Sequence, residues 1–128
     1  MLPPFGFHDS CINSLTQDVD VISLELESVQ EDTGPGELLL FSIKLTFTGV
    51  RGLLADGKPC EKITTEGDDG EIWELESTGK LVTMVVLWEI FSDPKKRVTR
   101  VYQFQCNNVN WERTSAGTVE TWGPKGTV

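Results

Sequence analysis

Apolar and polar side chains alternate along most of this chain, and a period of two is typical of strands with one buried face. The alternation is clear in residues 21–29 and again in residues 39–48. Residues 30–36 between them are rich in turn-forming residues, so we predict an antiparallel hairpin. No long segment has helical spacing, although residues 10–17 leave one or two turns of helix open.

Three further strands are predicted in the second half of the chain. Residues 71–76 alternate in a way that places Trp73 on the core side. Residues 80–91 are apolar on both faces, which predicts a central strand that is covered on both sides. Residues 98–106 then return as a neighbouring strand with Cys106 on its core side.

Short strands separated by turns, without an alternation of strands and helices, predict a mostly β fold. We expect a single-domain antiparallel β sandwich or a strongly curved, barrel-like sheet with little helix. The 128 residues are predicted to form one domain, because a chain of this length can bury a sizeable core. Residues 1–6 and 115–128 are predicted to be irregular, with Trp122 able to dock on the domain or to remain exposed.

Cysteine usage and the apolar runs bear on the cellular location. Cys11, Cys60 and Cys106 leave one thiol unpaired in any intramolecular scheme. The chain does not begin with the basic region and long apolar run of a signal peptide. Together these features predict a cytoplasmic protein with free thiols. No apolar run is as long as a membrane span, so we expect no membrane association.

His8 is the only histidine, and it limits the catalytic and metal chemistry that the chain could support. An enzyme that pairs His8 with a cysteine is one alternative, because such a pair supplies a base and a nucleophile. Adjacent residues within the segment 8–11 point to opposite faces of an extended chain, so that segment alone does not form a dyad. The cysteines are too scattered for a zinc knuckle, and residues 66–71 lack the spacing of a calcium loop. We therefore expect no catalytic residue, no metal site and no cofactor.

The charge of the chain is strongly asymmetric. The formal net charge is −9, and eight acidic residues but no lysine or arginine precede Lys44. Such a field repels nucleic acid and anionic lipid, and it attracts a basic protein surface. Glu25 and Glu27 are predicted to face solvent, while Glu31 and Asp32 are predicted to lie in the adjoining turn. These four acids are the candidate partner-binding residues, and we expect no nucleic-acid partner.

Two motifs near the start of the chain, with an acidic strand between them, carry a resemblance to known proteins. The motifs are Phe7-His8-Asp9-Ser10-Cys11-Ile12 and Leu45-Thr46-Phe47-Thr48-Gly49-Val50. The pattern resembles small β-rich bacterial proteins, largely uncharacterised, some of which are labelled immunity proteins of polymorphic toxin systems. The likeness extends to Tyr102-Gln103-Phe104-Gln105-Cys106 with Val109. It implies a cytoplasmic, non-catalytic protein that binds and blocks a toxin, and it contributes no catalytic residues.

Two hypotheses about function follow. The first is a non-catalytic protein-binding module, of the kind of an immunity-like inhibitor, that presents an acidic face to a basic partner. The alternative is a small β barrel that binds an apolar ligand, or the enzyme that uses His8 with a cysteine. A filled core beneath an acidic outer face would favour the first, and an apolar-lined cavity the second. The sequence leaves both a monomer and a homodimer open.

Overall fold

The computed structural model describes residues 2–121, and the regular structure in them is entirely β. Its strands form one antiparallel sheet that is not closed, in the order β10-β3-β2-β1-β6-β7-β8-β4-β5, and β9 also pairs with β3. The predicted fold class, an antiparallel sandwich or strongly curved sheet, is confirmed. The strands are β1 (Cys11–Asp18), β2 (Val21–Gly34), β3 (Glu37–Thr48), β4 (Arg51–Ala55), β5 (Lys58–Pro59), β6 (Asp69–Thr78), β7 (Leu81–Ile90), β8 (Lys96–Gln105), β9 (Asn108–Arg113) and β10 (Thr118–Thr121). Residues 2–121 contain no helix that could cross a membrane.

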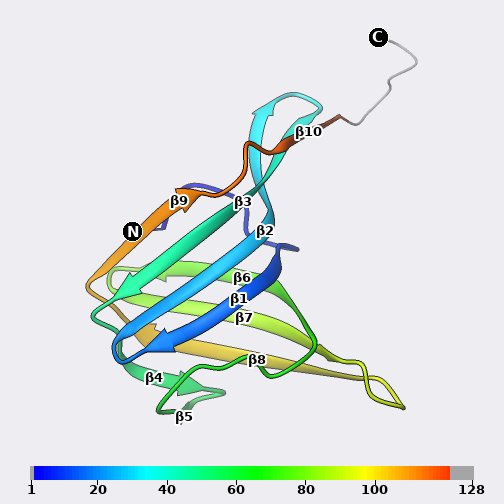
Figure 1. The fold of residues 1–128 in the computed structure, drawn as a ribbon. Coiled ribbons are helices and arrows are strands. Elements are labelled where there is room, and N and C mark those ends of the chain that lie inside the picture. The colour runs from blue at the N-terminus through cyan, green and yellow to red at the C-terminus, as the bar shows by residue number, and fades with distance from the viewer. Residues whose placement is uncertain (1, 122–128) are drawn as a thin grey trace.

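The sheet curves so that its two halves face each other across the core. Strands β9, β3, β2 and β1 lie across β6, β7 and β8 (Figure 1). The rings of Phe47 and Phe104, one from each half, meet edge-on with their centroids 5.2 Å apart. Trp88 is also buried, and its indole N–H donates to the Tyr102 hydroxyl at 3.0 Å. That hydroxyl in turn donates to Glu66, so the polar atoms of both buried rings have partners.

A pair of bends connects the two halves. Strand β3 continues into β4 and β8 into β9, while β3 pairs with β9 and β4 with β8. At the bends, Asn107 donates its backbone N–H to the Thr48 carbonyl at 2.8 Å, and Arg51 donates to the Asn107 side chain at 3.0 Å. Gly49 has a φ of 68°, and a Cβ there would lie 2.3 Å from Asn107 Nδ2. The bend therefore requires glycine at this position.

The predicted acidic hairpin is present as β2 and β3, but it is longer than expected. Pairing continues through Asp32 and Leu38 to Gly34 and Glu37, which leaves only two residues in the turn. Glu31 and Asp32 consequently lie in strand β2, and the prediction that they occupy the turn is wrong. Glu31 pairs with Leu39 and Asp32 pairs with Leu38 in β3. The many turn-forming residues of the segment had favoured a longer turn.

Residues 10–17 and 118–121 are among the segments that form strands where no strand was predicted. One or two turns of helix were considered for residues 10–17. Instead, the chain from Cys11 to Asp18 pairs with β2 and forms strand β1. Residues 118–121, predicted to be irregular, form β10 against residues 37–40 of β3. In both cases pairing with a neighbouring strand decides the structure of a segment with a weak pattern of its own. Trp122 lies outside the described residues.

Strand β7 has the central position predicted for it, between β6 and β8. Only its inner face is fully buried, however, since Leu81 is exposed and Val85 and Leu87 are half-buried. The prediction that both faces are covered is wrong, because the outer face of the curved sheet meets solvent at β7.

Candidate functional site

Three neighbouring strands each carry a β-bulge near the same cross-strand row. The register shifts fall in β1 between Ile12 and Ser14, in β2 between Leu26 and Val29, and in β6 between Ile72 and Glu74. Cys11 pairs with Glu27 on one side and with Glu71 on the other, so a single row joins the bulged strands. Bulges redirect side chains and are over-represented beside functional sites, which makes this region the first candidate.

The bulge in β6 brings Trp73 to the surface. Trp73 was predicted to lie in the core, yet its side chain is 52% exposed. Ile72 before it is buried, and Leu75 after it packs against the core opposite Met84. The prediction for Trp73 is wrong because one inserted residue breaks the alternation that was used to assign its face.

Four carboxylates gather around the half-buried thiol of Cys11. Glu27 and Glu71 are its cross-strand neighbours, and Asp9 and Asp69 also act on it through their charges. Burial, followed by these negative charges, raises the pKa of Cys11. A catalytic cysteine needs the opposite environment, one that favours the thiolate. We refer to these acids and the exposed indole as the bulged acidic patch, which comprises Asp9, Glu27, Asp69, Glu71 and Trp73.

His8 lies at the border of the bulged acidic patch. Its Nδ1–H donates to the backbone carbonyl of Trp73 at 2.7 Å, and its Nε2 lies 3.2 Å from the Asp9 carboxylate. The hydrogen bond to Trp73, followed by the charge of Asp9, raises the pKa of His8. Both ring nitrogens are thus engaged by oxygen atoms rather than by a thiol. Cys60 donates instead to a backbone carbonyl and Cys106 is fully buried, so no pairing of His8 with a cysteine is seen among residues 2–121.

Crowding of the carboxylates predicts a pH-dependent effect at Glu71. A hydrogen bond with Asp9, followed by partial burial and the charge of Asp9, raises the pKa of Glu71. A carboxyl whose folded pKa is raised stabilises the fold at low pH, and that stability is lost as pH rises from its unfolded pKa through its folded pKa. Glu71→Gln should therefore raise the melting temperature at about pH 8 and change it little at about pH 4.

Thermal unfolding followed by circular dichroism across this pH range measures the effect. Glu76→Gln removes one exposed acid from the same strand and serves as the matched control. A gain for Glu71→Gln that is as large at the acidic end as at the alkaline end would contradict the crowding of these carboxylates.

The bulge in β2 borders a hollow of about 570 Å³ between β2, β3 and the segment that leads into β10. Ser28 at this bulge has a φ of 60°, a conformation that serine seldom adopts. The lining includes the carboxylates of Glu27 and Glu120 and no basic side chain. A lysine or arginine of a partner would find two acidic groups there, so the hollow extends the bulged acidic patch.

The four acids predicted as one partner-binding face are separated in the structure. Only Glu27 belongs to the bulged acidic patch. Glu25 is half-buried and faces Lys44 across the strand pair. Asp32 is exposed, and its carboxylate accepts a backbone N–H of the hairpin end at 3.1 Å.

Glu31 lies on the opposite face from Glu27. The bulge between them reverses the alternation, and Glu31 follows the buried Val29 to the inner side of the sheet. There its carboxylate forms an ion pair of 2.6 Å with Arg113, whose guanidinium lies 4.2 Å from the centroid of the Phe41 ring. Glu31 therefore holds the end of β9 and does not share a face with Glu27.

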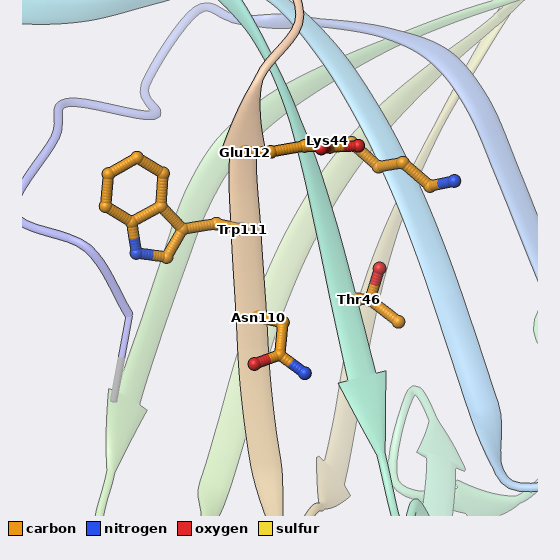
Figure 2. Close-up of a pocket in the computed structure, with 5 residues that line it drawn as sticks. All are labelled: Lys44, Thr46, Asn110, Trp111 and Glu112. Atoms are coloured by element: carbon orange, nitrogen blue, oxygen red, sulfur yellow. The ribbon is translucent and has the colours of Figure 1, made fainter.

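A smaller hollow of about 250 Å³ lies beside β3 and β9 (Figure 2). Its lining residues are Lys44, Thr46, Asn110, Trp111 and Glu112. The lining is polar apart from the indole, and neither this hollow nor the larger one is the apolar-lined cavity that the ligand-binding alternative requires. Among residues 2–121, no three histidine, cysteine or acidic side chains are grouped so that they could hold a metal ion.

No protein-family model, curated protein or solved structure matches this chain. Its functional interpretation therefore depends on the geometry of the bulged acidic patch. Sequence reasoning did not assign Asp9, Asp69, Glu71 or Trp73 to one site, although residues 8–11 and 66–71 had each stood out by composition. The pairing of β1 with β6 brings these two distant segments together, and no local sequence pattern predicts that pairing.

Proposed function

We propose that this protein is a non-catalytic binding module that uses the bulged acidic patch to bind a basic segment of another protein, as an immunity-like inhibitor of a toxin does. The observation that carries this proposal is the exposed indole of Trp73 on the bulged strand β6, which also carries two of the four carboxylates that act on Cys11. Tryptophan is enriched among the residues that dominate binding energy in interfaces. Carboxylates around such an anchor attract a basic partner and orient its approach.

The charge of the patch supports the same interpretation. Within residues 2–121, the arginines that form ion pairs are engaged by acids outside the patch. These pairs are Arg97 with Glu89, Arg100 with Asp56 and Glu66, and Arg113 with Glu31. In the patch itself only Asp9 has an ion-pair partner in this part of the chain, which is His8. Glu27, Asp69 and Glu71 form no ion pair in this part of the chain, although Glu71 shares a hydrogen bond with Asp9, so a basic segment of a partner would be attracted to them.

The chemistry of the patch also indicates the kind of partner. A row of carboxylates imitates the spaced negative charges of a phosphate backbone, so the natural target is a protein whose own ligand is polyanionic, such as a nuclease-like toxin. Burial and the surrounding carboxylates raise the pKa of the Cys11 thiol next to the patch, which suits a binding surface rather than a nucleophile.

Affinity capture from lysate of the native cells, with three baits, tests this proposal. Trp73 and Trp111 are similarly exposed, at 52% and 45%, so Trp111→Ala is a matched control for Trp73→Ala. We expect the wild type and Trp111→Ala to recover the same basic protein in stoichiometric amount. Trp73→Ala should lose most of it, because removal of an interface anchor costs about 2 kcal/mol, or about thirtyfold in affinity. Undiminished recovery by Trp73→Ala would contradict the proposal.

A further inference from the structure

Strand β9 forms an exposed edge of the sheet. One of its sides pairs with β3, and no strand among residues 2–121 pairs with the other. Five of its six side chains are exposed, including that of Trp111, which points to the opposite side of β9 from Asn110 and Glu112 (Figure 2). The strand contains neither a proline nor a bulge, two devices that proteins use to protect such edges.

The direction of the backbone groups in β9 follows from one hydrogen bond. Thr114, just after the strand, donates its N–H to the carbonyl of Ser42 in β3 at 2.9 Å. Because hydrogen-bonded and non-hydrogen-bonded pairs alternate along antiparallel strands, the register directs the N–H and C=O groups of Val109, Trp111 and Arg113 away from β3. These residues form a row of donors and acceptors ready for another strand.

A second copy of β9 fits this row. In an antiparallel arrangement with its two-fold axis at Trp111, each Trp111 pairs with its counterpart and each Val109 pairs with Arg113. On the other face Asn110 lies opposite Glu112 of the second copy, where its amide can donate to the carboxylate. No acid faces an acid in this register, although the chain carries a formal charge of −9. Self-pairing at this edge thus places no like charges directly opposite each other and gives each Glu112 carboxylate an amide donor.

We infer that the protein forms a symmetric homodimer by pairing its β9 edges around Trp111. The Trp111 indole already contacts the Phe5 ring edge-on, with centroids 5.3 Å apart, and the dimer adds a second indole beside it. The interface is separate from the bulged acidic patch, because β3 lies between β9 and the strands that carry the patch. Each dimer therefore presents two patches.

Sedimentation equilibrium over a concentration series tests the inference, with the wild type and Val109→Pro compared. Proline removes an outward N–H and its ring obstructs an incoming strand, whereas the ladder to β3 is spared because the Val109 N–H does not face β3. We expect the wild type to reach twice the chain mass and Val109→Pro to remain at one chain. Circular dichroism checks that the variant is folded.

A second variant keeps the inference testable if proline disturbs the fold. Trp111→Lys places two ammonium groups opposite each other at the two-fold axis and should also abolish the dimer. Thr16→Lys makes the same type of charge change at an exposed position on β1 and should leave the dimer intact.

Two results would overturn the inference. The first is a wild type that stays at one chain mass throughout the series, and the second is dimerisation of folded Val109→Pro and Trp111→Lys with wild-type affinity. In the first case, loss of basic-partner capture in Val109→Pro would show that the edge binds that partner instead of a second copy. Loss of the dimer with partner capture retained leaves the function proposed for the patch unaffected.

Discussion

Replacing Trp88 by alanine is expected to lower the free energy of unfolding by about 4 kcal/mol, because Trp88 is the largest fully buried side chain among residues 2–121. The side chain is 1% exposed, and its indole N–H donates to Tyr102. Its ring also packs on Gly70 so closely that a Cβ there would lie 2.6 Å from Cζ3. Alanine removes these contacts and leaves a cavity that the surrounding strands can close only in part. Urea unfolding with linear extrapolation measures the loss.

Trp73→Ala is the matched control, because it removes the same side chain from the neighbouring strand. Trp73 is half exposed, so its replacement should change the free energy of unfolding by no more than about 1 kcal/mol. Similar losses for the two variants would contradict the surface position of Trp73 and remove the anchor of the bulged acidic patch.

Much of the fold could be predicted from the sequence because each long strand buries one face. Phe41, Ile43, Leu45 and Phe47 alternate along β3, and all four are buried as expected. Cys106, which directly follows β8, was predicted to face the core, and it is fully buried. In these strands no residue is inserted between the apolar positions, so a period of two is sufficient to assign their faces.

The candidate site could not be predicted in the same way, because it is built where the alternation fails. The bulge at Trp73 falls within a run that contains no glycine or proline, and nothing in its composition marks the inserted residue. The bulge in β2 likewise moved Glu31 to the inner face, away from Glu27. The meeting of Asp9 with Glu71 depends on pairing between β1 and β6, which are more than fifty residues apart. Local patterns carry no information about that pairing.

Reversing charge in the bulged acidic patch is expected to slow association with the captured partner by about tenfold to a hundredfold at low salt. The variant combines Glu27→Lys with Glu71→Lys and changes the formal charge by four, from −9 to −5. The control combines Asp18→Lys with Asp20→Lys, which makes the same change at exposed residues around the β1–β2 turn. The patch variant should be the slower of the two, because charges at the contact surface direct the encounter more strongly than distant ones.

The association rate of the wild type, the patch variant and the control, measured against that partner across a salt series, tests the proposed function most directly. The bulged acidic patch predicts that the wild type and the control associate rapidly at low salt and slow steeply as salt increases. The patch variant should be slow at low salt with a shallow salt dependence, and the three rates should converge at high salt as the charges are screened. Equal rates and slopes for all three proteins, or equal slowing of the patch variant and the control, would show that the partner does not bind at this patch.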